Sequence, residues 1–457
     1  MNALILLSCL GLVALFAEIF NFKKALFPIV LAGVAITFIV NTLDWNRPSI
    51  HFNMMYFDNY AVAFTGVILS IAFLWFLMAQ SYFKEEANLT DHFALILFAL
   101  AGAVIMVSYS NMCMLFLGIE ILSISMYILA GSNKSSLASN EAAMKYFLMG
   151  AFATGFLLFG IVLIYGATAS FDLPMIGKYV AANPANISGL FYAGVLLILI
   201  GLSFKISAAP FHFWAPDVYQ GAPTVITAFM ATIVKTAAFA AFFRLFFSCF
   251  VSISGVWSDV IWCITLLTLI IGNVTAVYQT SVKRMLAYSS VAHAGYLLLA
   301  ILAMNKISAS SILYYSAAYS IATIAAFTVL YIIMRQKEDD SINAFNGLGK
   351  TNPLISGIMT IAMLSLAGIP PMAGFFAKYY IFNAALQNDH LGIVIIAVMA
   401  SLVGVYYYFK IIIALYFKED SSSTSLEIPP TLKLVLVITA ILMLVIGLFP
   451  DFIIGLL

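Results

Sequence analysis

The chain has 457 residues, of which 64% are hydrophobic and 9% are charged, and its mean hydropathy is +1.08. A water-soluble domain carries about 25% charged residues, so the composition excludes a soluble globule and predicts an all-α, polytopic membrane protein. The formal net charge of +1 indicates no nucleic-acid partner. The four cysteines (Cys9, Cys113, Cys249 and Cys263) lack metal-ligand spacing, so we expect packing residues and no bound metal.

Apolar runs of about 20 residues, the length that crosses a bilayer, recur along the whole chain. They predict fourteen transmembrane helices, near residues 2–20, 25–43, 58–81, 89–109, 112–131, 141–166, 188–209, 223–246, 256–279, 284–304, 309–334, 353–387, 391–417 and 431–455. The first run has no basic region ahead of it and no small-residue cleavage site, so we expect a retained helix and not a signal peptide.

Basic residues between the spans predict the orientation of the chain in the membrane. With both termini outside, eleven basic residues face inward: Lys23, Lys24, Lys84, Lys134, Lys283, Arg284, Arg335, Lys337, Lys350, Lys418 and Lys433. Four face outward: Arg47, Lys178, Arg244 and Lys306. Because positive residues accumulate on the cytoplasmic side, both termini are expected on the outer side.

Two spans combine proline with a lysine. The seventh reads "GLSFKISAAPFHFWAPDVYQGAP", with Lys205 five residues before Pro210. The twelfth reads "LSLAGIPPMAGFFAKYYIFNAAL", with Pro370 and Pro371 ahead of Lys378. A proline removes one backbone hydrogen bond and clashes with the preceding turn, so carbonyls are freed that can accept from water or from the amine. We therefore predict that helices 7 and 12 are broken at these prolines.

Interrupted helices at corresponding places in two halves are typical of transporters built from inverted repeats. Residues 143–165 resemble residues 311–333, at an offset of 168 residues. The pattern predicts N-terminal helices in 1–88, a first five-helix repeat in 89–250, an inverted second repeat in 251–418 and a C-terminal helix in 419–457.

Five lysines lie inside predicted spans: Lys145, Lys205, Lys235, Lys378 and Lys410. Because a lysine at mid-bilayer costs about 2.5 to 3.5 kcal/mol, several on separate helices predict a proton or ion path. For Lys145 and Lys410 an alternative stays open, in which the amine extends from a helix end to the headgroups.

Two carboxylates accompany these lysines. Glu120 lies near the middle of the fifth span, and Ser123 and Tyr127 follow at i+3 and i+7 on the same helix face. Glu141 precedes Lys145 by four residues and is able to pair with it, either on the path or as a helix-end salt bridge.

The tenth span carries "AYSSVAHAGY", which places His293 close to hydroxyl groups at helical spacing and predicts the lining of a wet channel. A neutral imidazole that simply bonds a neighbouring helix remains the alternative for His293. For the threonines of the eighth span (Thr224, Thr227 and Thr232), bonding to their own helix is the favoured interpretation.

The strings "KISAAPFHFWAPDVYQGAP", "SLAGIPPMAGFFAKYYIF" and "VKRMLAYSSVAHAGY" resemble the antiporter-like membrane subunits of respiratory complex I, the proton-pumping NADH:quinone oxidoreductase. The resemblance covers nearly the whole chain. It implies a glutamate–lysine pair (Glu120 with Lys205), a connecting lysine (Lys235) and a terminal lysine (Lys378). Of the three bacterial paralogues, the largest has a long C-terminal lateral helix that this chain lacks, and another has glutamate where Lys378 stands.

The chain shows no iron–sulfur cysteine cluster, no suitable haem ligands, no phosphate loop and no dinucleotide fingerprint. It is therefore expected to act as a translocase subunit without redox chemistry or cofactor of its own. The resemblance places NAD, FMN, iron–sulfur clusters and quinone in partner subunits. It also implies contacts with other membrane subunits, including neighbouring antiporter-like ones, in the bacterial inner membrane.

Two alternatives stay open. The chain could be a subunit of a multi-subunit sodium/proton antiporter, whose subunits share the broken helices. It could also be a structural membrane subunit with vestigial charges, although four mid-membrane ionisable groups argue against that.

Overall fold

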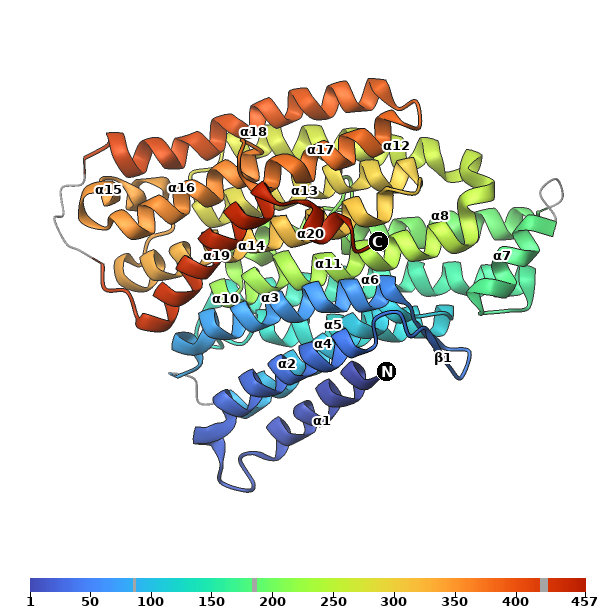
Figure 1. Ribbon diagram of the computed structural model, residues 1–457, viewed down its shortest axis with the longest axis horizontal. Helices are drawn as coiled ribbons and strands as arrows, with labels where there is room; N and C mark the ends of the chain where they lie inside the picture. The colour runs from blue at the N-terminus through green and yellow to red at the C-terminus, as the bar shows by residue number, and fades with distance from the viewer. Residues whose placement is uncertain (85–87, 183–186, 420–425) are drawn as a thin grey trace.

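A computed structural model describes residues 1–84, 88–182, 187–419 and 426–457. Most of its long helices run roughly parallel, with α1 and α2 at one edge and α18 along the opposite edge (Figure 1). The helices are α1 (Asn2–Phe16), α2 (Leu26–Leu43), α3 (Asn59–Phe83), α4 (Leu89–Ser108), α5 (Met112–Ala130), α6 (Leu137–Thr168), α7 (Leu173–Ala182), α8 (Gly189–Lys205), α9 (Trp214–Gly221), α10 (Thr224–Phe229), α11 (Lys235–Leu245), α12 (Ser254–Val277), α13 (Val282–Ala303), α14 (Ser308–Lys337), α15 (Leu348–Thr351), α16 (Pro353–Ala367), α17 (Ala373–Leu386), α18 (Leu391–Phe417), α19 (Pro430–Leu448) and α20 (Asp451–Ile454).

The all-α membrane fold is confirmed. Within the described residues, 10 helical segments are long and apolar enough to cross a bilayer, and α1, α8 and α16 are shorter apolar helices. The count of fourteen spans and the inversion of the second repeat stay predictions.

Both predicted helix breaks are present. The break in the seventh span lies closer to the N-terminus than expected, because α8 ends at Lys205 and not near residue 209. Pro210 has no N–H, and its ring would clash with the carbonyl four residues before it, so the helix cannot continue through Ile206. In the twelfth, α16 ends at Ala367, Gly368 adopts the left-handed conformation with φ +83°, and α17 begins at Ala373.

The order of packed helices is similar in the two halves. In the first half α4 packs on α5 and α6 packs on α8; in the second half α12 packs on α13 and α14 packs on α16. This correspondence supports the predicted repeat. The domain limits at 88/89, 250/251 and 418/419 stay predictions, and residues 85–87 and 420–425, next to two of these limits, lie outside the described residues.

Helices α13 and α14 form the centre of the molecule, since 94% of the apolar window of each is buried inside the chain. Polar side chains on these two helices therefore face protein and not lipid. This burial explains why hydroxyl and imidazole groups on α13 need partners from neighbouring helices.

Some local features carry no strong sequence signal. A short hairpin pairs β1 (Ser49–His51) with β2 (Met55–Phe57), and π-helical segments at Met230–Val234 and Phe246–Phe250 flank α11. The expectation that all four cysteines are packing residues is wrong, because only Cys249 is buried. Hydrocarbon accepts an exposed thiol, so an apolar run does not show which face of a helix is packed.

Candidate functional site

Three lysines lie inside the protein on three different helices. Lys205 ends α8, Lys235 begins α11 and Lys378 lies in α17, and their exposed fractions are 7%, 3% and 7%. In the described part of the chain, none of the three forms an ion pair within 4.0 Å. A buried charge without a counter-ion is costly and is seldom retained without a function.

Lys205 is held by the fifth helix. Its Nζ donates to Ser123 Oγ at 2.5 Å, and the Ser123 hydroxyl donates to the carbonyl of Ile119 one turn earlier. Glu120, half-buried on α5, is close enough to interact electrostatically with Lys205 but does not contact it. The implied glutamate–lysine pair is therefore not a direct ion pair in this structure, because Ser123 occupies the bonding position.

A small cavity adjoins Lys205. It measures about 10 Å³ and lies between α5, α6 and α8, where Gly150 and Gly201 leave space beside Tyr127. A volume of this order is close to the lower limit for one water molecule.

Lys235 is bonded to the buried helix α13. Its Nζ donates to both the carbonyl and the hydroxyl oxygen of Ser290, each at 2.5 Å. The π-helical segment Met230–Val234 ends immediately before Lys235, and such segments are frequent at functional sites. The ring of Tyr319 lies beneath the amine, at 5.9 Å.

Lys378 is bonded to the break in its own span. Its Nζ donates at 2.7 Å to the carbonyl of Ala367, the last residue of α16, and at 2.7 Å to Ser401 Oγ of α18. The Tyr296 ring lies 4.9 Å from the amine. The proline break and the lysine therefore belong together, because the break frees a carbonyl that solvates the ammonium.

His293 lies between the second and third lysines. Its Nδ1 is 2.6 Å from the Tyr315 hydroxyl and its Nε2 is 3.1 Å from the Tyr408 hydroxyl, so it joins α13 to α14 and α18. The charges of both Lys235 and Lys378 reach it electrostatically. Since both ring nitrogens have hydroxyl partners, the neutral-imidazole interpretation also stays open.

Polar groups of α13 and α18 contact one another and the second and third lysines. The Tyr408 hydroxyl lies 2.5 Å from the Ser289 hydroxyl and also contacts His293. Ser401, seven residues before Tyr408, accepts a hydrogen bond from Lys378. Sequence reasoning missed Ser401 and Tyr408, although their seven-residue spacing places them on one face of α18. We call the set Lys205, Lys235, His293, Tyr408 and Lys378 the lysine row.

Three intervals of the row are not bridged by a hydrogen bond between described residues: Lys205 to Lys235, Lys235 to His293, and Tyr408 to Lys378. Across the first of them, helix α8 packs on α11. Transfer across each interval needs water or side-chain movement.

Lys145 and Glu141 lie apart from the lysine row. Lys145 Nζ is 2.7 Å from Glu141 and 2.8 Å from Asp217 of α9, and Arg284 of α13 is 2.8 Å from Asp217. The Lys145 side chain is 40% exposed, on a surface cavity of about 350 Å³. The arrangement favours the helix-end salt bridge for this pair, and Asp217 ties α6, α9 and α13 together.

Burial raises the pKa of Asp217, but the hydrogen bonds from Lys145 and Arg284 outweigh burial and hold the pKa below its ordinary value. The folded state is therefore stabilised by the ionised carboxylate at neutral pH, and this contribution is lost as the pH falls through the lowered pKa.

Asp217→Asn should lower the unfolding temperature at pH 7 by a small amount, because the network is half-exposed and such pairs are weak. The difference from the parent chain should shrink as the pH is lowered towards 3, where the parent carboxylate is protonated. Thermal unfolding at a series of pH values measures both effects. Asp259→Asn, at an exposed position of α12, is the matched control; an equal change there would contradict the role of Asp217.

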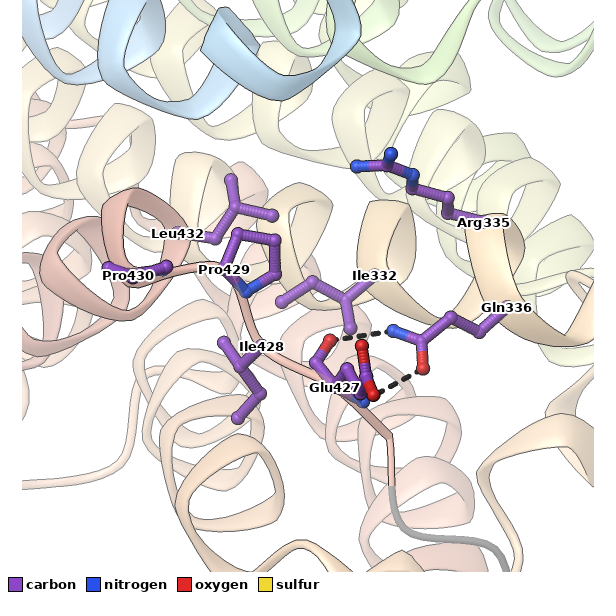
Figure 2. Close-up of a pocket in the computed structure, with 8 residues that line it drawn as sticks. All are labelled: Ile332, Arg335, Gln336, Glu427, Ile428, Pro429, Pro430 and Leu432. Carbon is purple, nitrogen blue, oxygen red and sulfur yellow. Dashed lines mark hydrogen bonds between the residues drawn. The ribbon is translucent and has the colours of Figure 1, made fainter.

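Other polar residues of the spans have local roles. Lys410 donates to the carbonyl of Val277 at 2.9 Å, near the end of α12, and does not join the lysine row. Thr232 bonds the carbonyl of Ala228 one turn earlier, as expected. For the other two threonines the expectation is wrong or incomplete: Thr224 bonds Met334 of α14, and Thr227 bonds Tyr219 of α9 at 2.9 Å as well as Pro223 at 3.3 Å, because both lie at the α9–α10 turn, where other segments are within reach. A cavity of about 430 Å³ between the end of α14 and the start of α19, where Gln336 bonds the backbone of Glu427, also lies away from the row (Figure 2).

The family model described as "NADH:quinone oxidoreductase/Mrp antiporter, TM" matches residues 108–404. A protein named NADH-quinone oxidoreductase subunit N from Cytophaga hutchinsonii is 45% identical over 453 residues, covering 99% of this chain and 98% of that protein. A protein of the same name from Flavobacterium psychrophilum is 44% identical over 459 residues, covering 100% of both.

Solved structures of related membrane complexes contain chains with the same fold. A chain of respiratory complex I from Thermus thermophilus superposes with a TM-score of 0.86 at 32% identity, covering 99% of this chain and 98% of that one. A chain of the Mrp complex from Dietzia sp. DQ12-45-1b gives 0.84 at 20% identity, covering 100% and 95%, which shows the shared fold alone. The family model matches most of the chain, and the relatives align with it along nearly their whole length. This protein therefore belongs to the NADH:quinone oxidoreductase/Mrp antiporter membrane family.

Proposed function

We propose that this chain is a proton-translocating membrane subunit of NADH:quinone oxidoreductase, of the kind named subunit N. The observation that carries the proposal is the lysine row: three buried ammonium groups that contact no counter-ion among the described residues, each bonded to hydroxyl or carbonyl oxygens. Lysine ammoniums in such surroundings can lose and regain a proton, whereas arginine would stay charged.

In this proposal Glu120 tunes the proton affinity of Lys205. A nearby carboxylate favours the charged amine and burial disfavours it, so a small shift of Glu120 changes whether Lys205 holds its proton. Protons then pass to Lys235 and, through Ser290, His293 and Tyr408, to Lys378.

Water is expected near the Lys205 end of the row. Three buried polar atoms around the α8–α9 break have no hydrogen-bond partner among the described residues: Tyr146 OH, Ser203 Oγ and His212 Nδ1. Buried polar atoms of this kind are where ordered water normally binds.

The energy for pumping has to come from outside this chain. Moving one charge against 100 mV requires about 2.3 kcal/mol. NAD, FMN, iron–sulfur clusters and quinone would be bound by partner subunits, and neighbouring antiporter-like subunits would lie beside this chain in the bacterial plasma membrane. The charge distribution along the sequence favours both termini on the outer side.

The alternative is a subunit of a multi-subunit sodium/proton antiporter. Purification of the complex from its native membrane, followed by identification of the co-purifying chains, separates the two. Flavin and iron–sulfur subunits are expected; a complex that contained only small hydrophobic partners would favour the antiporter.

Ser123→Ala should slow proton translocation several-fold, because it removes the hydroxyl that accepts from Lys205. Ser125→Ala is the matched control, since Ser125 is also buried on α5 but bonds only the carbonyl of Ile121. Quinone reductase activity and proton pumping of the assembled complex are the measurements. Equal rates in the two variants would show that Ser123 has only a packing role.

A further inference from the structure

Two cavities lie one after the other along α2 and α3, away from the lysine row, and we call them together the groove. At one end a cavity of about 380 Å³ is lined by three lysines (Lys23, Lys24 and Lys84) together with the rings of Phe27 and Phe83. Farther along, a second cavity of about 380 Å³ is lined almost entirely by apolar side chains of α2, α3 and α19, among them Phe38, Phe73 and Leu442. One end of the groove is basic and the rest is apolar.

The two cavities lie along the same faces of α2 and α3. On α2, Phe27 in the first cavity and Val34 and Phe38 in the second are spaced i, i+7 and i+11, which places them in one stripe of a helix. On α3, Gln80, Phe73 and Leu69 have the same spacing in the reverse direction, i, i−7 and i−11. Eleven residues of helix extend about 16 Å, comparable with half the hydrocarbon thickness of a bilayer.

Two of the three lysines at the basic end have no counter-ion among the residues that the structure describes. Lys23 is 3.8 Å from Glu18, whose other oxygen accepts from Thr90. Lys24 and Lys84 form no ion pair or side-chain hydrogen bond with any residue that the structure describes. The Oε1 atom of Gln80, which also lines this cavity, is buried and likewise has no partner among the described residues.

We propose that this groove binds one anionic phospholipid. The phosphate lies between Lys24 and Lys84, the headgroup bonds the carboxamide of Gln80, and an acyl chain follows the stripe of Val34 and Phe38 to the wall formed by α19. Basic pockets between membrane helices bind anionic headgroups in this way.

The shape and polarity of the groove favour this occupant over others. A soluble anion would leave the apolar cavity unused, and a zwitterionic lipid would gain less from two lysines. A transmembrane helix is about 10 Å wide or more and has no phosphate to place between Lys24 and Lys84. The lipid would fill the contact between the edge helix α2 and the body formed by α3 and α19.

The test is native mass spectrometry of the delipidated complex, titrated with phosphatidylglycerol and, separately, with phosphatidylethanolamine. We expect one tight phosphatidylglycerol adduct on this chain and weaker binding of phosphatidylethanolamine. Replacing both lysines, Lys24→Gln with Lys84→Gln, should weaken phosphatidylglycerol about 25-fold, because each basic residue near a membrane surface contributes about five-fold.

Lys418→Gln, at an exposed lysine after α18, is the matched control and should leave the affinity unchanged. Ala35→Phe, which fills the apolar cavity without altering charge, should also displace the lipid and keeps the proposal testable if the double variant fails to assemble. Equal affinity for the two lipids, or an equal loss in Lys418→Gln, would overturn the proposal. The proposal would also be overturned if Ala35→Phe released a protein subunit from the complex while the number of bound lipids stayed unchanged.

Discussion

Replacing Lys235 by methionine should reduce proton translocation by about ten-fold or more, as expected when a group that transfers protons is removed. Methionine matches the length and volume of the lysine stem, so the buried site around Ser290 stays filled. The chain should therefore fold and assemble, while the proton loses its lysine carrier between Lys205 and His293. Quinone reductase activity should fall together with pumping, because blocked transfer stalls coupled turnover.

Two further variants make this result specific. Lys410→Met removes another membrane lysine that bonds a helix-end carbonyl but lies outside the lysine row, and it should have little effect. Lys235→Arg should impair pumping as well, because arginine stays protonated in proteins. Normal pumping per NADH in assembled Lys235→Met complex would exclude Lys235 from the path.

Gly368→Ala should impair both stability and pumping. Gly368 has φ +83°, a conformation that costs an L-residue about 1–2 kcal/mol. In addition, a Cβ at this position would lie 2.8 Å from Cδ and 3.2 Å from Nζ of Lys378. The amine would have to leave the carbonyl of Ala367 or the hydroxyl of Ser401, so the terminal lysine would lose part of its solvation.

Gly357→Ala is the matched control because Gly357 lies in α16, the helix that Gly368 follows, with open space around the position of a Cβ. Thermal unfolding reports the strain, and the pumping rate of the assembled complex reports the displacement of Lys378. If Gly368→Ala pumped as fast as Gly357→Ala, the close contact with Lys378 would have no bearing on transport.

The positions of the two broken helices follow from local chemistry and were therefore predictable. Proline beyond the first turn of a helix lacks a needed N–H and clashes with the preceding turn, so Pro210 and the pair Pro370 and Pro371, which follow whole helices, interrupt their spans. The same holds for the membrane class, since apolar runs of bilayer length need no partner to be recognised. Local rules also gave the Glu141–Lys145 contact, which needs only a helix and a spacing of four.

The partners of the buried lysines were not predictable in the same way. Lys205 bonds Ser123 from 82 positions away, and Lys378 bonds Ser401 of the following helix. Helical spacing placed Ser123, and not Ser125, on the face of Glu120, but it did not indicate which helix that face meets. Both serines also bond back to their own helix.

By itself, the sequence determined that the chain is helical, that it lies in a membrane, where two helices break and which residues are charged inside the bilayer. Each of these depends on a residue and its close neighbours along the chain. Only the tertiary structure decided that Glu120 stops short of contacting Lys205, that Tyr408 joins Ser289 to His293, and that Lys145 lies apart from the row. These depend on how helices rotate and pack against one another, and in hydrocarbon the polar pattern of one helix does not fix which neighbour satisfies it.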